Sequence, residues 1–183
     1  VDDDSIVDAD DNPLGGAGPG NGDFVSGETY TIDKTPPVVE SITRADGNPS
    51  NAGTVRFRVA FSETVGGVGM DDFLLIGDGV SSPSISSIMA VGEVYFVGVN
   101  TGSGDGTLGL ELIDDDSIRD QVSFPLGGAG AGNGDFTEGE VYTIDKSPPD
   151  VSDIAVSPDV AGTGAEVTIR ITLSEAPASA PTV

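Results

Sequence analysis

The chain of 183 residues contains no cysteine, no histidine and no tryptophan. Without cysteine it forms neither disulfides nor thiolate metal sites. Without cysteine or histidine, the common nucleophile–base pairs of hydrolases cannot be built. Only three tyrosines are present, which disfavours a platform for stacking sugars. Paired carboxylates alone suffice for glycoside hydrolysis, but the acids here gather at predicted module junctions and no aromatic subsites accompany them. The sequence therefore predicts that the protein is not an enzyme.

Positive charge is also scarce, because seven Lys and Arg residues stand against 31 Asp and Glu residues, giving a formal net charge of −24. Binding to phosphate backbones requires clustered Lys and Arg, so nucleic acid is excluded as a partner. No apolar run reaches the roughly 18–20 residues that span a bilayer, and we expect no membrane insertion within this window. Divalent cations are the natural complement of such a surface. The alternative is that the acids serve only to keep the protein soluble in concentrated salt.

What the chain does contain is a repeat with a spacing of 112 residues. Residues 2–6 (DDDSI) return at 114–118, and residues 30–34 (YTIDK) return at 142–146. This period exceeds that of solenoid repeats and matches a whole small domain. We therefore expect the C-terminal part of one repeat at residues 1–36, a complete repeat at 37–148, and the N-terminal part of a third at 149–183. The same interpretation predicts a natural polypeptide that is longer at both ends.

Alternation of apolar and polar residues with period two is the recurring local pattern. In residues 54–61 it places four apolar side chains on one face, namely Val55, Phe57, Val59 and Phe61. The complete repeat contains seven such segments, at residues 38–43, 54–61, 73–76, 85–91, 93–100, 107–112 and 140–145. Seven short strands separated by Gly, Asn, Asp and Ser predict an all-β fold of tandem immunoglobulin-like antiparallel β-sandwich modules. A small β-barrel is the alternative.

Two other segments interrupt the pattern. Double prolines follow the last strand of each repeat, at 36–37 and 148–149, and predict semi-rigid linkers because proline fixes φ. Residues 113–138 form a loop that combines an acidic run with a glycine-rich stretch. Loops of this length are usually functional or disordered. We expect its like charges to require compensation, and Phe136 and its copy Phe24 to anchor the end of the loop in the core.

Three sequence segments resemble the bacterial immunoglobulin-like (Big) and cadherin-like repeats of large surface adhesins and extracellular fibres. They are residues 61–65 (FSETV), residues 104–108 (GDGTL), and the joint at 30–37 with its copy at 142–149. The resemblance implies a secreted or cell-surface stalk, often stiffened by calcium near the module junctions. The Asp-X-Asn-Asp-Asn pattern of cadherin linkers is absent, so that set of ligands is not transferred.

Topology predicts where such a cation would bind. In a seven-stranded sandwich the turns after strands two and six lie at the end where the chain enters, and acidic residues follow both strands and occupy the entering linker. Gathered carboxylates repel one another unless a cation lies between them. Calcium suits the site better than magnesium because it accepts six to eight oxygens in a flexible geometry. With their repeat copies, the predicted calcium ligands are Asp33, Glu63, Asp114, Asp115, Asp116, Asp120, Asp2, Asp3, Asp4, Asp8, Asp145 and Glu175. A hydrated acidic face without metal is the alternative.

One acidic segment also resembles the start of a helix–loop–helix calcium site. Residues 8–12 (DADDN) carry oxygen ligands at positions one, three and five, but the following glycine and the distal glutamate are missing. The copy at residues 120–124 (DQVSF) keeps only the first ligand. A site that uses Asp10 and Asn12 is therefore not general to the repeats.

Together these patterns predict a structural spacer of an extracellular adhesin or filament, rigidified by calcium at its module junctions. Its partners would be neighbouring repeats of the same polypeptide, with self-association into a fibre as a further option. A glycan-binding or protein-binding adhesion module, acting through residues 81–87 or the glycine-rich loop, is one alternative, and a salt-adapted repeat without metal is another. A Lys–Asn isopeptide bond is disfavoured, because Lys34 and Lys146 lie in linkers.

Overall fold

The computed structural model describes residues 1–177, which belong to two compact units. The first unit is Val1–Lys34 and the second begins at Thr35. Of the predicted third segment, 149–183, the last six residues lie outside the described part. Among residues 1–177 no helix is long and apolar enough to cross a membrane.

The first unit is a folded loop followed by an extended segment. Its described pairing is a single antiparallel bridge between Val7 and Pro13. The extended segment exposes Tyr30 and Ile32 almost fully, at 94% and 75%. Phe24 is also 81% exposed, so the anchoring predicted for it is absent in this unit. The strands that would cover these side chains have no counterpart in residues 1–34.

The second unit is all-β, with antiparallel strands and one short 3₁₀ turn, η1 (Met70–Asp72). The strands are β1 (Val39–Arg44), β2 (Thr54–Phe61), β3 (Phe73–Asp78), β4 (Ser84–Val91), β5 (Val94–Asn100), β6 (Gly106–Leu112), β7 (Val141–Ile144), β8 (Val151–Ser157) and β9 (Thr168–Leu173). Each of the seven segments predicted from alternation overlaps one of the strands β1 to β7. Those seven strand predictions are therefore confirmed.

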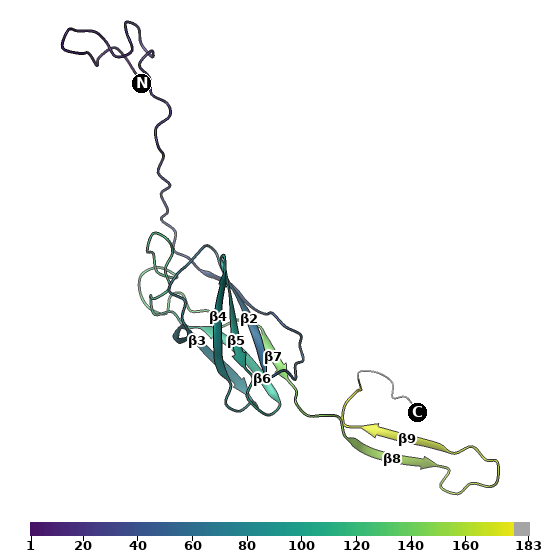
Figure 1. The fold of residues 1–183 in the computed structure, drawn as a ribbon. Helices are drawn as coiled ribbons and strands as arrows, with labels where there is room; N and C mark the ends of the chain where they lie inside the picture. The colour runs from purple at the N-terminus through teal and green to yellow at the C-terminus, as the bar shows by residue number, and fades with distance from the viewer. Residues whose placement is uncertain (178–183) are drawn as a thin grey trace. The chain divides into compact units, whose positions relative to one another are not determined.

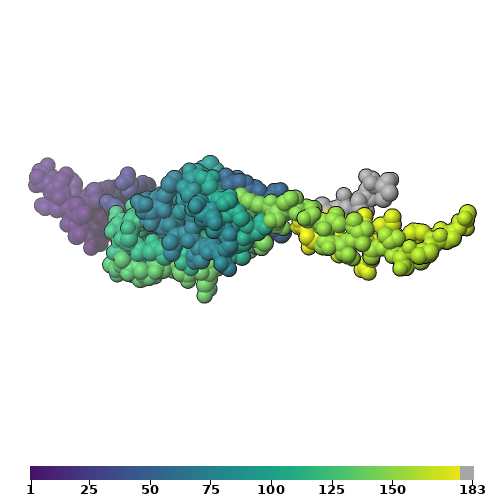
Figure 2. Space-filling view, turned by 90° about the horizontal axis from the view of Figure 1, so that it is seen from below, coloured from purple at the N-terminus to yellow at the C-terminus, as the bar shows by residue number. Residues whose placement is uncertain are grey.

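Strands β1 to β7 form two sheets, one ordered β1-β2-β5-β4 and the other β3-β6-β7 (Figure 1). A single hydrophobic core unites them, because its buried side chains come from both sheets. In Figure 2 the residues coloured from blue to green, which include these strands, form one closely packed body. Two antiparallel sheets that share a core are consistent with a β-sandwich.

The core follows the predicted alternation. Val55, Phe57 and Val59 are fully buried on β2. Phe57 meets Tyr142 of β7 edge to face, with ring centroids 5.1 Å apart. The Tyr142 hydroxyl donates to Arg56 O at 2.7 Å and accepts from Asp46 N–H at 2.8 Å. The buried phenol is thus satisfied on both sides and joins β7 to the region of β1 and β2.

The hairpin β8–β9 repeats the pairing of β1 with β2. Ile154 pairs with Ile171, as Ile42 pairs with Val59, and each residue is displaced by 112 positions. Both pairs also have a register irregularity after their first residue, Val39 in one and Val151 in the other. Two sequences with little identity therefore adopt the same register, because their apolar patterns agree. The apolar side chains of the hairpin are exposed except for Leu173, which is half-buried.

Candidate functional site

The long loop between β6 and β7 is held by its own backbone amides. Asp114 is 4% exposed and accepts from Asp116 N–H at 3.0 Å and from Gly134 N–H at 3.2 Å. Its own N–H donates to Asp135 Oδ1 at 2.7 Å. Asp116 in turn accepts from Gly130 N–H at 3.1 Å. Oriented amide dipoles thus offset the like charges of these aspartates, whereas the sequence led us to expect a cation in this role.

The first unit contains the same loop conformation. Asp2 accepts from Asp4 N–H at 3.1 Å and from Gly22 N–H at 3.1 Å, matching the pattern at Asp114. Asp4 and its copy Asp116 both lie in the left-handed region, with φ of 64° and 67°. The two loops therefore share these contacts and this backbone conformation at the repeat spacing.

Three apolar side chains of the loop reach the core. Ile118 and Leu126 are 1% and 0% exposed, and Phe136 packs against the same cluster. Phe136 thus fulfils the predicted anchoring role in the second unit. The loop is thereby fixed to the sandwich at its middle and at its end.

Residues next to Glu63 hold the chain that enters the second unit. Val38 N–H donates to Ser62 Oγ at 3.0 Å, and Ser62 N–H donates to Val38 O at 2.9 Å. Gly127 N–H donates to Pro37 O at 2.9 Å. The entering chain is therefore bound to the turn after β2 and to the long loop at once.

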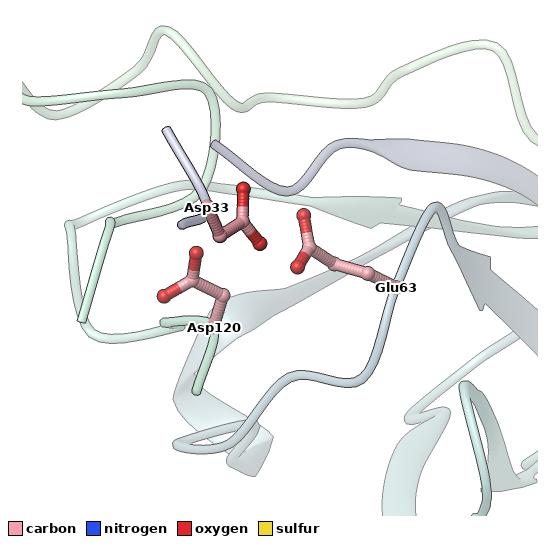
Figure 3. A group of neighbouring side chains, drawn as sticks. All are labelled: Asp33, Glu63 and Asp120. Carbon is pink, nitrogen blue, oxygen red and sulfur yellow. The ribbon is translucent and has the colours of Figure 1, made fainter. Parts of the chain in front are cut away.

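Three of the predicted calcium ligands come together beside this entry (Figure 3). Asp33, Glu63 and Asp120 each place one carboxylate oxygen within 4.8 Å of the others. Figure 3 shows the three carboxylates facing a common space.

Asp120 is the most buried member of this group, at 8% exposure. Its Oδ1 accepts from Val122 N–H at 2.9 Å and from Phe124 N–H at 2.8 Å. Its Oδ2 is buried and receives no hydrogen bond from any of residues 1–177. At 4.8 Å and an effective dielectric constant of about 20, two full charges repel by roughly 3 kcal/mol. The three carboxylates are thus a set of oxygens that could hold a cation.

The other predicted ligands lie elsewhere, and the described residues contain no second group of three acids at this spacing. Asp114, Asp116, Asp2 and Asp4 hold their loops, as described above. Asp115 and Asp3 are exposed, and hydrogen bonds from Ser117 and Ser5, including backbone N–H bonds of 2.9 Å and 3.1 Å, lower the pKa of each carboxyl below its usual value. Asp145 and Glu175 line one hollow together with the linker Lys146–Pro149.

Asp8 is the first-unit copy of Asp120. Asn12 donates from its side chain to both oxygens of Asp8, at 3.2 Å and 3.0 Å. These bonds, together with those from the backbone amides of Asn12 and Asp10, lower the pKa of Asp8. The carboxylate of Asp8 is thus satisfied within its own turn.

Sequence reasoning missed three aspartates with structural roles. Asp72 is 5% exposed and accepts from Gly69 N–H at 2.6 Å and from Ser117 Oγ–H at 2.8 Å. Asp105 accepts from Lys146 N–H at 2.6 Å and from the Ser147 hydroxyl, which lowers its pKa. Asp135 accepts from the loop backbone, as noted above. Asp135 recurs as Asp23 at the repeat spacing, and this recurrence is a sequence signal that could have identified it. Asp72 and Asp105 have no repeat copy in the given sequence that could serve as such a signal.

No protein-family model, curated protein or solved structure matches the chain.

Proposed function

We propose that the chain is a segment of a tandem array of immunoglobulin-like modules that acts as a structural spacer in an extracellular adhesin or filament. The sheet orders β1-β2-β5-β4 and β3-β6-β7 support this proposal, because constant-type immunoglobulin domains have the same arrangement of their seven strands. The repeated register of β8–β9 supports a further module of the same kind. A spacer needs no catalytic residues, which agrees with the lack of cysteine and histidine in the chain.

Hydrogen bonds at both ends of the module support a mechanical role. At the entry, the pair between Val38 and Ser62 fixes the chain to the turn after β2. At the exit, the Asp105 carboxylate accepts hydrogen bonds from Lys146 N–H and from the Ser147 hydroxyl. Lys146 Nζ also donates to Gly102 O at 2.8 Å. The prolines that adjoin both points restrict φ. Both ends of the module are thus held by hydrogen bonds to its own loops.

Calcium at the module junction is the second part of the proposal. The single observation that carries it is the buried, unpartnered Oδ2 of Asp120 beside Asp33 and Glu63. Burying an anionic oxygen without a donor is costly, and a bound cation removes this cost. Calcium fits a mixed set of linker and loop carboxylates with flexible geometry, whereas magnesium demands a stricter octahedron. The ion would be shared by the carboxylates of Asp33, Glu63 and Asp120.

The setting we propose is the cell surface or the extracellular space, where millimolar calcium is available to weak sites of extracellular modules. The partners would be neighbouring repeats of the same polypeptide, and assembly into a fibre is compatible with the same geometry.

Chelation tests this function directly. In calcium we expect the chain to melt at a higher temperature and to scatter X-rays as a stiffer particle than in EDTA, because an ion bound only to the folded state stabilises it. The matched control is the Asp115→Asn variant, whose substitution lies outside the three-carboxylate group. If melting and scattering do not change on chelation, the acids serve only to adapt the surface to salt.

A further inference from the structure

Two five-residue turns, one in each unit, share the same backbone geometry. In the first, Asp8 N–H donates to Asn12 O at 3.0 Å; in the second, Asp120 N–H donates to Phe124 O at 3.0 Å. The residue before the last has positive φ in both, at 63° for Asp11 and 74° for Ser123. Each turn is also closed by an antiparallel bridge at its ends. The repeat therefore presents the same aspartate on the same scaffold twice.

The backbone donors to this aspartate are also the same. Asp8 Oδ1 accepts from the N–H groups of Asp10 and Asn12 at 2.9 Å and 3.0 Å. Asp120 Oδ1 accepts from those of Val122 and Phe124 at 2.9 Å and 2.8 Å. The two turns differ in burial, since Asp8 is exposed and Asp120 is buried, and in what reaches the second oxygen.

The last residue of the turn decides what reaches that oxygen. Asn12 Nδ2–H donates to Asp8 Oδ2 at 3.0 Å. A phenylalanine ring has no donor for this purpose, and Asp120 Oδ2 is buried without a partner among the described residues. A hydrogen bond to an ionised carboxylate is a strong one, and a ligand that takes this oxygen must compete with the amide.

We propose that the residue four positions after this aspartate determines whether the junction of a given repeat depends on a cation. With phenylalanine, as at Phe124, the aspartate needs an external positive charge and recruits calcium together with Glu63 and the linker. With asparagine, as at Asn12, the turn satisfies its own aspartate and calcium binds weakly. The inference rests on the proposed calcium site and goes beyond it, because it makes the junctions of one array non-equivalent.

The experiment compares the intact chain with variants at this one position. We expect Phe124→Asn to weaken calcium binding by about tenfold or more, because the new amide competes with calcium for Asp120 Oδ2. Phe124→Leu, which removes the ring without adding a donor, is the matched control and should bind within about threefold of wild type. The affinity is measured by calorimetric titration with calcium chloride, and circular dichroism verifies that each variant is folded.

A second variant and a second readout keep the inference falsifiable if Phe124→Asn does not fold. Phe124→Gln presents an amide on a longer side chain and should weaken binding in the same direction. In EDTA the amide variants should melt at a higher temperature than Phe124→Leu, because they satisfy the buried oxygen. If wild type binds calcium and both amide variants bind it with the same affinity, this inference is wrong and the proposed calcium site is retained. No calcium binding by wild type overturns both.

Discussion

Glu63, which follows β2, and Asp120, in the loop after β6, place carboxylate oxygens within 4.8 Å of each other. The two residues are far apart in sequence, and the β-sheet topology brings them together. Each alone would be an ordinary acid on an acidic protein. Their proximity, with Asp33 as the third member, is what distinguishes this group from the other carboxylates of the chain.

Asp120→Asn tests the contribution of the most buried member. The variant keeps an oxygen for the amides of Val122 and Phe124 and replaces the unpartnered oxygen with an uncharged amide. We expect its melting temperature in EDTA to equal or exceed that of wild type. The rise on adding calcium, equivalent to about 2.7 kcal/mol at a concentration of 100 times Kd, should be lost. Asp115→Asn should keep the full rise, and differential scanning calorimetry measures both. An undiminished calcium effect in Asp120→Asn would remove this residue from the site.

Leu126→Ala tests whether the long loop is part of the core. Leu126 is fully buried, so its truncation should lower the free energy of unfolding by about 2–5 kcal/mol. Leu14 occupies the same repeat position in the first unit and is 43% exposed. Leu14→Ala should therefore change the stability of the second unit by less than about 0.5 kcal/mol. Urea titration of both variants gives the comparison, and equal effects would contradict the described packing.

Tyr142→Phe removes a single hydroxyl from the contact with Phe57. The hydroxyl bridges Arg56 O and Asp46 N–H, so its loss leaves two backbone groups without their partner. We expect the free energy of unfolding to fall by about 1–3 kcal/mol with little change in the denaturant slope. Guanidinium titration monitored by circular dichroism measures this loss. A neutral result would show that water replaces the hydroxyl.

The ion pair between Asp46 and Arg56 predicts a dependence of stability on pH. The Arg56 guanidinium donates to Asp46 at 2.7 Å and holds the pKa of this carboxyl below its usual value of 3.8. Because the pKa is lower in the folded state, the stabilisation is complete above the unfolded pKa and is lost as the pH falls through the folded pKa. The difference in melting temperature between wild type and Asp46→Asn should thus be constant from pH 7 to pH 5 and shrink below pH 3.8. A difference that grows on acidification would contradict this assignment.

Much of the fold is predictable from local pattern. Alternation, as around Phe57, reports which face of a strand is buried. This pattern was enough to predict all seven strands of the complete repeat. The chain order of the strands also sufficed to predict that Glu63 and Asp120 approach each other. The repeat spacing predicted that β8–β9 resembles β1–β2, since register follows the apolar pattern.

The roles of individual acids were harder to predict. Asp114 and Asp116 lie in the acidic run that sequence reasoning assigned to calcium, yet their oxygens accept amides of Gly134 and Gly130. Gly130 has a positive φ of 118°, a backbone conformation that composition alone does not reveal. Asp72 was missed for another reason, because its side-chain partner Ser117 lies 45 residues away in sequence. Any non-proline residue has a backbone N–H, so a carboxylate that accepts from the backbone is not marked by a sequence motif.

Calorimetric titration of the intact chain with calcium chloride, beside the variants Asp120→Asn and Asp115→Asn, tests the central claim most directly. The account predicts saturable binding in wild type and in Asp115→Asn, and loss of that binding in Asp120→Asn. The absence of binding heat in wild type, together with a melting temperature that calcium does not change, would contradict a calcium site at the junction. The linkers and their hydrogen bonds to Asp105 and Ser62 would then be left as the source of stiffness.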